Sequence, residues 1–323
     1  MPRRLLVVLT VSALVFGAGA VYLTWRDGSL PSLIPPVEQC QARVDGHLVE
    51  LDVEQSRYAA LIAAVSVQRA MPARAATIAL ATAYQESDLR NLEYGDRDSL
   101  GLFQQRPSQG WGSRGQVLDP YYATNAFYDA LVKVDGYTAM PVTQAAQEVQ
   151  RSGFPDAYAD HERDARVLAS ALTGNSRAAF WCTVDDDRQE VSPDLDDTGL
   201  TERATAVRDD LARTFGDLAL GGFAPGGVRE GHMPGSAHYD GRAIDVFVRP
   251  VSEDNKRRGW AIAGYLVAQA DRLGIATVIF DDRIWKVGSR SQDGWQNYRV
   301  PSSSNGDPSI LEHRDHVHVD VSA

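Results

Sequence analysis

Two short stretches near the C-terminal end contain residues whose types and spacing suit metal binding. In the first, residues 236–245, His238 and Asp245 stand seven positions apart with Gly241 between them. The second, residues 312–319, ends in His-Val-His-Val and continues into Asp-Val. This alternation of polar and apolar residues predicts a half-buried strand.

Side chains of a strand point alternately to its two faces, so His316, His318 and Asp320 would share one face. If the strand that contains Asp245 lies beside this one, His238, Asp245 and His318 can converge on one point. Two imidazoles and a carboxylate with an open fourth position are typical of a catalytic zinc site. A single histidine on a strand is more often a core or surface residue, but the complete set favours Zn²⁺.

The spacing Ser-x-His-x-x-Gly-x-Ala-x-Asp of residues 236–245, followed far downstream by a His-x-His strand, resembles a known pattern. It is similar to that of the zinc peptidases of the D-Ala-D-Ala metallopeptidase/hedgehog superfamily. The resemblance covers residues 200–323. It implies that His238, Asp245 and His318 bind zinc, and that a carboxylate shortly before the last ligand is the general base.

Two acids compete for the role of base. Asp315 stands three positions before His318, the spacing of the bacterial peptidases, and Glu312 stands six before it, the spacing of the hedgehog domain. We favour Asp315 and keep Glu312 as the alternative. His316, on the same predicted face as His318, could stabilise an oxyanion in its protonated form.

Several neighbouring side chains are candidates for supporting roles. Arg229 or Arg242 could pair with a substrate carboxylate, although an ion pair in solvent is an equally good interpretation. Ser236 is a further substrate-binding candidate. Asp320 is placed to orient a metal ligand, and His232 lies close enough in sequence to do the same.

A second candidate site lies near the end of a predicted helix over residues 73–90. Ala79, Ala83 and Glu86 fall at positions i, i+4 and i+7, so the Glu86 carboxyl lies on a stripe of small apolar residues. Poor solvation favours the protonated form of a carboxyl group and suits a general acid. Cleavage of a glycosidic bond needs such a proton donor.

The sequence Glu86-Ser, followed by Gly101-Leu-Phe-Gln104, resembles the pattern of lysozyme-like lytic transglycosylases. The resemblance implies that Glu86 is the single acid/base and that Gln104 helps to line the sugar cleft. It also implies aromatic side chains that stack on sugars, for which the candidates are Trp111, Tyr121 and Tyr122. Phe103 replaces the usual Met, and no clear Tyr-Asn motif follows.

The N-terminal stretch predicts a signal-anchor transmembrane segment over residues 1–25. A short basic flank precedes residues 5–25, which carry no charge and are long enough to span a bilayer. Positive charge before the span predicts a cytoplasmic N-terminus and extracytoplasmic domains, with the chain held to the membrane by this helix. Cleavage after Ala20, which would release a secreted protein, is the alternative.

The remaining chain divides by composition into four parts. Residues 26–39 contain prolines and predict a linker, and residues 183–199 predict an acidic one. Between them, residues 40–182 show helical periodicity, which predicts an all-α lysozyme-like domain. Residues 200–323 predict an α+β hedgehog/DD-peptidase-like domain. Cys40 and Cys182, the only cysteines, predict a disulfide bond that brackets the helical part.

The chain has 323 residues. Its features together predict a cell-wall hydrolase that acts on the stem peptides and glycan strands of peptidoglycan. A net charge of −11 argues against nucleic acid as a partner. A non-catalytic peptidoglycan-binding protein with a structural zinc site is the alternative. A protein in which only one of the two domains is active is another.

Overall fold

In the computed structural model, which describes residues 37–323 except 154–155, 188 and 303, the chain begins with a β-hairpin. Strand β1 (Gln39–Val44) pairs antiparallel with β2 (His47–Leu51) through a turn at Asp45 and Gly46. Both turn residues have positive φ, 48° and 80°, the conformation of a type I′ hairpin turn. A third strand, β3 (Phe180–Thr183), pairs with the other edge of β1.

The prediction of an all-α domain over residues 40–182 is therefore wrong. An Asp-Gly pair flanked by alternating apolar residues is a strong hairpin signal, and here Cys40, Ala42, Val49 and Leu51 are buried in alternation. We gave more weight to the helical periodicity of the longer segments and did not predict these short strands. The third strand, β3, pairs with β1, which is far away in the sequence, so no local pattern indicates it.

The helices of this part follow the predicted order. Asp119 caps α5 with its side chain and Pro120 occupies the first helical position, as expected. Alanine-rich α3 lies against α2, α6 and α7, and most of its residues are buried. The helices are α2 (Val53–Gln68), α3 (Ala73–Ser87), η1 (Pro107–Gln109), α4 (Arg114–Leu118), α5 (Pro120–Leu131), α6 (Val142–Gln150), η2 (Ala157–His161) and α7 (Glu162–Leu172).

The predicted disulfide bond between Cys40 and Cys182 is confirmed. The two residues are direct partners on the adjacent strands β1 and β3, and their sulfur atoms are 2.00 Å apart. The bond closes a loop with a sequence separation of 142. In the chain-entropy model a loop of this length stabilises the fold by roughly 5 kcal/mol.

Residues 202–323 build a six-stranded antiparallel sheet and the helices that cover it. The strand order is β4-β5-β9-β6-β7-β8, so the last strand of the chain lies between β5 and β6. Helix α9 packs against β6 and β9 and is buried over most of its C-terminal half. The strands are β4 (Leu220–Gly221), β5 (Ala243–Phe247), β6 (Ile275–Phe280), β7 (Arg283–Lys286), β8 (Gln296–Asn297) and β9 (His316–Val321). The helices are α8 (Glu202–Phe215), η3 (Ala237–Asp240), α9 (Glu253–Ala268), α10 (Ala270–Leu273), η4 (Gly288–Asp293) and α11 (Pro308–Leu311).

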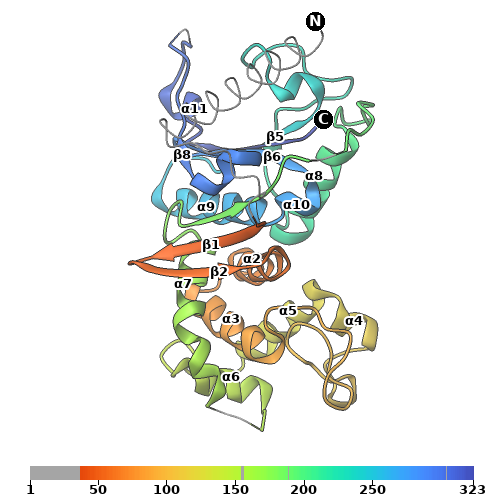
Figure 1. The fold of residues 1–323 in the computed structure, drawn as a ribbon, viewed down its shortest axis with the longest axis vertical. Coiled ribbons are helices and arrows are strands. Elements are labelled where there is room, and N and C mark those ends of the chain that lie inside the picture. Colours follow the sequence, from red (N-terminus) through yellow and green to blue (C-terminus); the bar gives the residue numbers. More distant parts are fainter. Residues whose placement is uncertain (1–36, 154–155, 188, 303) are drawn as a thin grey trace, which may run out of the picture. The chain divides into compact units, whose positions relative to one another are not determined.

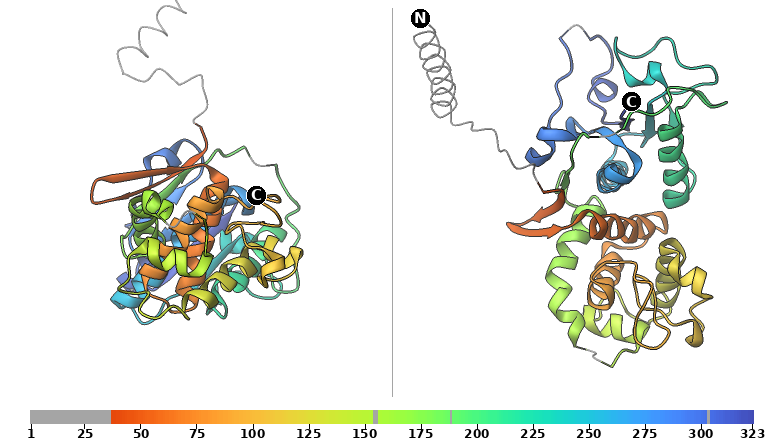
Figure 2. Two further views of the ribbon diagram at one scale, coloured as in Figure 1. Left: turned by 90° about the horizontal axis from the view of Figure 1, so that it is seen from below. Right: turned by 45° about the vertical axis from the view of Figure 1, so that its right-hand side comes forward.

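One hydrophobic core runs through residues 38–323, which form one compact unit. Helix α2 packs on α3 and α5 and also on α8 and α9 (Figures 1 and 2). Tyr121 lies at this junction, where its hydroxyl is 2.9 Å from Thr214 Oγ1 and 3.2 Å from Tyr265 Oη. The predicted boundaries at 182 and 200 fall inside this unit, and Tyr121 is engaged in packing rather than free to contact a sugar.

The predicted membrane-spanning segment, residues 1–25, lies outside the described residues, as does most of the predicted linker that follows it. None of the helices described between residues 37 and 323 is long and apolar enough to cross a membrane. The prediction of a transmembrane protein with a single-pass localisation is therefore not supported by the described residues.

Candidate functional site

Three side chains that the sequence predicts as metal ligands meet at the junction of η3, β5 and β9. Asp245 on β5 is the direct antiparallel partner of His318 on β9, so the two side chains leave the same face of the sheet. The helical turn η3 precedes β5 and delivers His238 to the same place. All three residues are buried.

The donor atoms of these residues are mutually close. His238 Nε2 is 3.1 Å from His318 Nδ1 and 3.2 Å from Asp245 Oδ1, and His318 Nδ1 is 3.1 Å from Asp245 Oδ1. Ligands bound to a tetrahedral zinc ion at about 2.0–2.1 Å are about 3.3 Å from one another. The three atoms therefore already have nearly the spacing that one metal ion requires.

The outer nitrogen of each imidazole faces an acceptor that fixes its proton. His238 Nδ1 is 2.7 Å from the carbonyl oxygen of Gly222, to which it must donate. His318 Nε2 is 3.5 Å from a carboxylate oxygen of Asp320, the orienting role predicted for that residue. Both inner nitrogens then point lone pairs at each other across 3.1 Å, an arrangement that needs a cation or a proton between them. This chemistry fits a metal ion.

The pKa shifts of Asp245 and His318 agree with this conclusion. Burial raises the pKa of Asp245, but hydrogen bonds with His238 and His318 outweigh it and hold that pKa far below its usual range. Burial lowers the pKa of His318, whereas hydrogen bonds with Asp245 and Asp320 raise it, and the net result is a pKa of about 9. Metal ligands must be deprotonated, so a metal ion at this site would compete with protons.

Gly222 is required beside His238 for steric reasons. Its φ of +81° is unfavourable for other residues. A Cβ atom at this position would lie 2.2 Å from Cε1 of His238 and 3.2 Å from Oδ2 of Asp245. The carbonyl of Gly222 can approach the imidazole only because the residue has no side chain.

The two candidate bases have different surroundings, and neither Asp315 nor Glu312 is among the residues that line the cavity at this site. Asp315 is buried, with Oδ1 2.7 Å from His316 Nδ1 and Oδ2 2.6 Å from Arg249 Nε. Glu312 instead accepts a hydrogen bond of 2.6 Å from Arg314 Nε. His316 does line the cavity, and its Nε2 is 3.7 Å from Asp245 Oδ1.

The predicted substrate-binding residues are only partly brought together. Ser236 lines the cavity and caps η3 by accepting from the backbone N–H of His238. Arg242 also lines it, but its guanidinium donates to Asp240 and to the carbonyl of Val321. Arg229 is exposed on the loop before η3 and is not among the lining residues.

Arg249 is a cavity residue that the sequence reasoning missed. Its guanidinium lies 4.1 Å from the ring centroid of Phe247, and its side chain is half exposed. It could have been found by extending the alternation of β5, because Asp245, Phe247 and Arg249 stand two positions apart. Asp315 holds Nε of Arg249, and the rest of the half-exposed guanidinium is accessible from the cavity.

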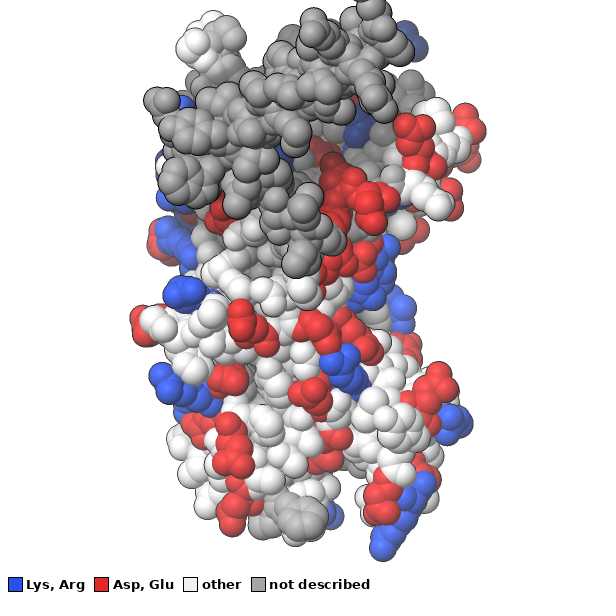
Figure 3. Space-filling model, viewed as in Figure 1, with Lys and Arg blue, Asp and Glu red and all other residues white. Residues whose placement is uncertain are grey.

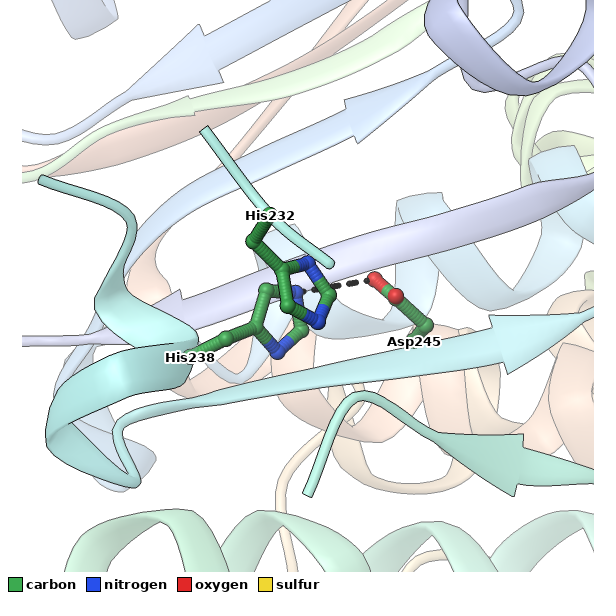
Figure 4. Close-up of side chains that lie close together, drawn as sticks. All are labelled: His232, His238 and Asp245. Atoms are coloured by element: carbon green, nitrogen blue, oxygen red, sulfur yellow. Dashed lines mark ion pairs between the residues drawn. The ribbon is translucent and has the colours of Figure 1, made fainter. Parts of the chain in front are cut away.

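The cavity has a volume of about 700 Å³ and contains two more histidines. His313 packs 4.7 Å from His316, and burial together with the neighbouring imidazoles lowers its pKa to about 3. His232 stacks on His238 with ring centroids 3.9 Å apart (Figure 4). Donor atoms of His232, His238 and Asp245 all lie within 4.8 Å of one another, which makes this group a possible metal site. His232 was predicted only to support a ligand, but its ring contacts His238 and its donor atom lies among those of the candidate ligands.

The second candidate site is centred on Glu86, near the end of α3. Tyr158 donates a hydrogen bond of 2.7 Å to Glu86 Oε1. Burial raises the pKa of Glu86, and hydrogen bonds from Tyr158 and Gln150 offset this only in part. Gln150, in turn, donates to the carbonyl of Phe103 at 2.6 Å. A carboxyl group in these surroundings can serve as a proton donor.

A cavity of about 880 Å³ lies beside this site and is lined by Gln150 and by Trp111, one of the aromatic residues predicted to contact sugar. Gln104 is not among its lining residues. Its amide donates to the carbonyls of Tyr94 and Gly101 and so supports the loop that contains them.

Comparison with known families gives one match. Residues 196–308 match the family described as VldE, C-terminal domain. No curated protein matches the chain. The matched range contains His232, His238 and Asp245 and ends before β9, which carries His318.

Proposed function

We propose that this protein is a zinc-dependent peptidase that cleaves the stem peptides of peptidoglycan. One observation carries the proposal: the donor atoms of His238, Asp245 and His318 lie 3.1–3.2 Å apart in one large cavity. The outer nitrogens of both imidazoles are already occupied, so the free lone pairs face inward. Three protein ligands leave a position open, as catalytic zinc sites require.

Zn²⁺ would be held by these three residues, and when bound it would polarise a peptide carbonyl and lower the pKa of water. The chain itself supplies the proton transfer. Asp315 accepts from Nδ1 of His316, which leaves Nε2 of that imidazole facing the ligands. His316 therefore replaces the predicted carboxylates as the group that takes a proton from water and returns it to the leaving amine, with Asp315 as its orienting partner.

Arg249 gives the cavity a group that suits the peptide's carboxylates. Asp315 holds its Nε and Phe247 supports its flat face, so the outer edge of the guanidinium is directed by two contacts. A planar guanidinium binds carboxylates with two parallel hydrogen bonds. Stem peptides contain free carboxylates, and this favours them over uncharged peptides as substrates.

Surface charge is consistent with a partner other than nucleic acid. The net charge of the chain is −11. Acidic side chains are spread over the described part of the face in Figure 3, with basic ones among them. Nucleic-acid binding usually needs a continuous basic area.

A second activity, glycan cleavage by the Glu86 site, is favoured by a separate observation. Glu86 has a raised pKa and a hydrogen bond from Tyr158, and its second partner, Gln150, lines a cavity that also contains Trp111. A single buried carboxyl group can protonate a glycosidic oxygen. The two activities act on different bonds of the same polymer and can be measured independently.

Digestion of purified peptidoglycan, followed by mass analysis of the released fragments, tests the peptidase. Shortened stem peptides should appear with the zinc-loaded protein, disappear with a chelator and return when zinc is added. The His318→Ala variant should release none and bind no zinc. A His47→Ala variant is the matched control, because His47 pairs with Asp164 far from the cavity.

Stoichiometric zinc binding without any shortened peptide would instead identify a binding module. Unchanged peptide release by His318→Ala would show that the metal site is not the catalytic centre.

A further inference from the structure

A glycine-rich loop carries a third imidazole to the metal site. The loop, residues 222–236, connects β4 to η3 and contains His232. The ring of His232 lies on that of His238 with an angle of 23° between the planes, and the dashed ion pair in Figure 4 joins His238 to Asp245 beside it. The imidazole therefore lies directly over the ligands.

Tyr239 fixes the backbone of the loop at this point. The Tyr239 hydroxyl donates to the carbonyl of His232 at 2.5 Å and accepts from its N–H at 3.1 Å. Tyr239 also follows His238 directly in η3. The η3 turn thus positions both His238 and, through Tyr239, the imidazole of His232 that stacks on it.

The loop on either side of His232 has few steric constraints. Gly226, Gly231 and Gly235 all have positive φ, and a Cβ atom on any of them would have no neighbour within 4 Å. Glycine gives the backbone access to conformations of both signs of φ. The backbone at these three glycines can therefore change conformation without a steric clash, while Tyr239 holds the loop at His232.

The spacing of donor atoms limits the shift that coordination could need. The donor atoms of His232, His238 and Asp245 all lie within 4.8 Å of one another, and ligands of one tetrahedral zinc ion are about 3.3 Å apart. His232 therefore needs at most a small inward movement to share a metal ion with the other residues. The three ligands named above need no such movement.

We propose that His232 is the fourth protein ligand of the metal site and that it closes the position left open by His238, Asp245 and His318. The inference rests on the proposed zinc site and adds to it a mobile ligand. In the closed form the metal has four protein ligands, as structural zinc sites do. The loop must move away before a peptide carbonyl can occupy the fourth position.

Titration with Co²⁺, followed by visible absorption, tests this assignment without a measurement of activity. Wild-type protein should bind one Co²⁺ with the intense bands of a four-coordinate site. His232→Ala should still bind Co²⁺, with weaker bands and an affinity lower by about 10–100-fold, at least the loss found for outer partners of metal ligands. Free imidazole should restore the bands of His232→Ala by occupying the vacated position.

Two further variants complete the experiment. Tyr239→Phe removes both hydrogen bonds to the backbone of His232 but leaves the imidazole, so its affinity should lie between those of wild type and His232→Ala. His232→Gln, which keeps a polar side chain on the loop, should behave as His232→Ala does. Far-ultraviolet circular dichroism verifies that each variant is folded.

Failure of the inference and failure of the proposed site can be distinguished. A spectrum and an affinity unchanged in His232→Ala, with Co²⁺ binding lost in His318→Ala, would overturn the fourth-ligand assignment and leave the three-ligand site intact. Wild-type Co²⁺ binding in His318→Ala would instead overturn the zinc site.

Discussion

The metal centre draws its donors from three separate elements, whereas the candidate acid of the helical part is one side chain on one helix. At the metal centre, the pairing of β5 with β9 sets the positions of Asp245 and His318. At the other site, the properties of Glu86 come from burial and from hydrogen bonds with Tyr158 and Gln150. The metal centre should therefore be sensitive to backbone geometry, and the Glu86 site to the protonation of one group.

The largest expected effect is on glycan cleavage by Glu86→Gln. The amide cannot transfer a proton, so release of anhydro disaccharides should fall by about 10²–10⁴-fold, the usual contribution of a general acid. Release of shortened peptides should remain, because the metal centre does not contain this residue. Mass analysis of both product classes measures the two activities in one digest.

Glu54→Gln is the control for this comparison, since Glu54 is a partly exposed carboxylate that pairs with Arg90. Its glycan cleavage should equal that of wild type. Undiminished anhydro products from Glu86→Gln would remove the second activity from the proposal.

Backbone sensitivity of the metal centre is tested by Gly222→Ala. The new methyl group would collide with His238 and force the imidazole away from its carbonyl partner. Zinc affinity, measured by competition with a chromogenic chelator, should fall by about 10–100-fold. Gly226→Ala has a similar φ of +77° but no atom near the added Cβ, so it separates backbone strain from collision. Equal affinities for the two variants would contradict the steric argument.

A smaller change is expected from Tyr158→Phe. The hydroxyl stabilises the ionised form of Glu86, so its loss should raise the pKa of Glu86 further. The alkaline limit of glycan cleavage should then move to higher pH, and the pH profile of peptide cleavage should stay in place. Tyr84→Phe provides the control, because that ring stacks on His161 and does not bond to Glu86. A shift to lower pH would show that the hydroxyl acts in another way.

The smallest effect concerns stability. Because burial raises the pKa of Glu86 in the folded protein, the stabilisation linked to its protonation is present below the unfolded pKa and is lost as pH rises through the folded pKa. Glu86→Gln stays neutral, so it should unfold at higher denaturant concentration than wild type at neutral pH and match it in acid. The difference should be about 1 kcal/mol, a common size for one substitution. Equal unfolding midpoints for the two proteins at both pH values would contradict the raised pKa.

Sequence patterns predicted elements best where the evidence was local. The His-Val-His alternation identified β9 and the face it presents, and Asp119-Pro120 marked the start of α5. The same kind of evidence was present for the β1–β2 hairpin in Asp45-Gly46, but helical periodicity in the longer segments was given more weight. β3 had no strong signal of its own, because its pairing with β1 joins residues far apart in the chain.

Individual roles at the sites were harder to predict. Spacing made Asp315 the favoured base, yet its carboxylate is engaged by His316 and Arg249. Tyr121 had the residue type for sugar contact, but its hydroxyl forms hydrogen bonds with Thr214 and Tyr265. Such partners lie on other elements, and no local pattern gives their distances.

By itself, the sequence determined which side chains can bind a metal and which of them share a face, because the two-residue period of a strand follows from backbone geometry. It also determined the cysteine pair. Only the tertiary structure decided that β9 lies beside β5, that Gly222 approaches His238 without a side chain between them, and that the ring of His232 stacks on that of His238. These contacts depend on the register and packing of distant segments, which a local pattern of residues does not specify.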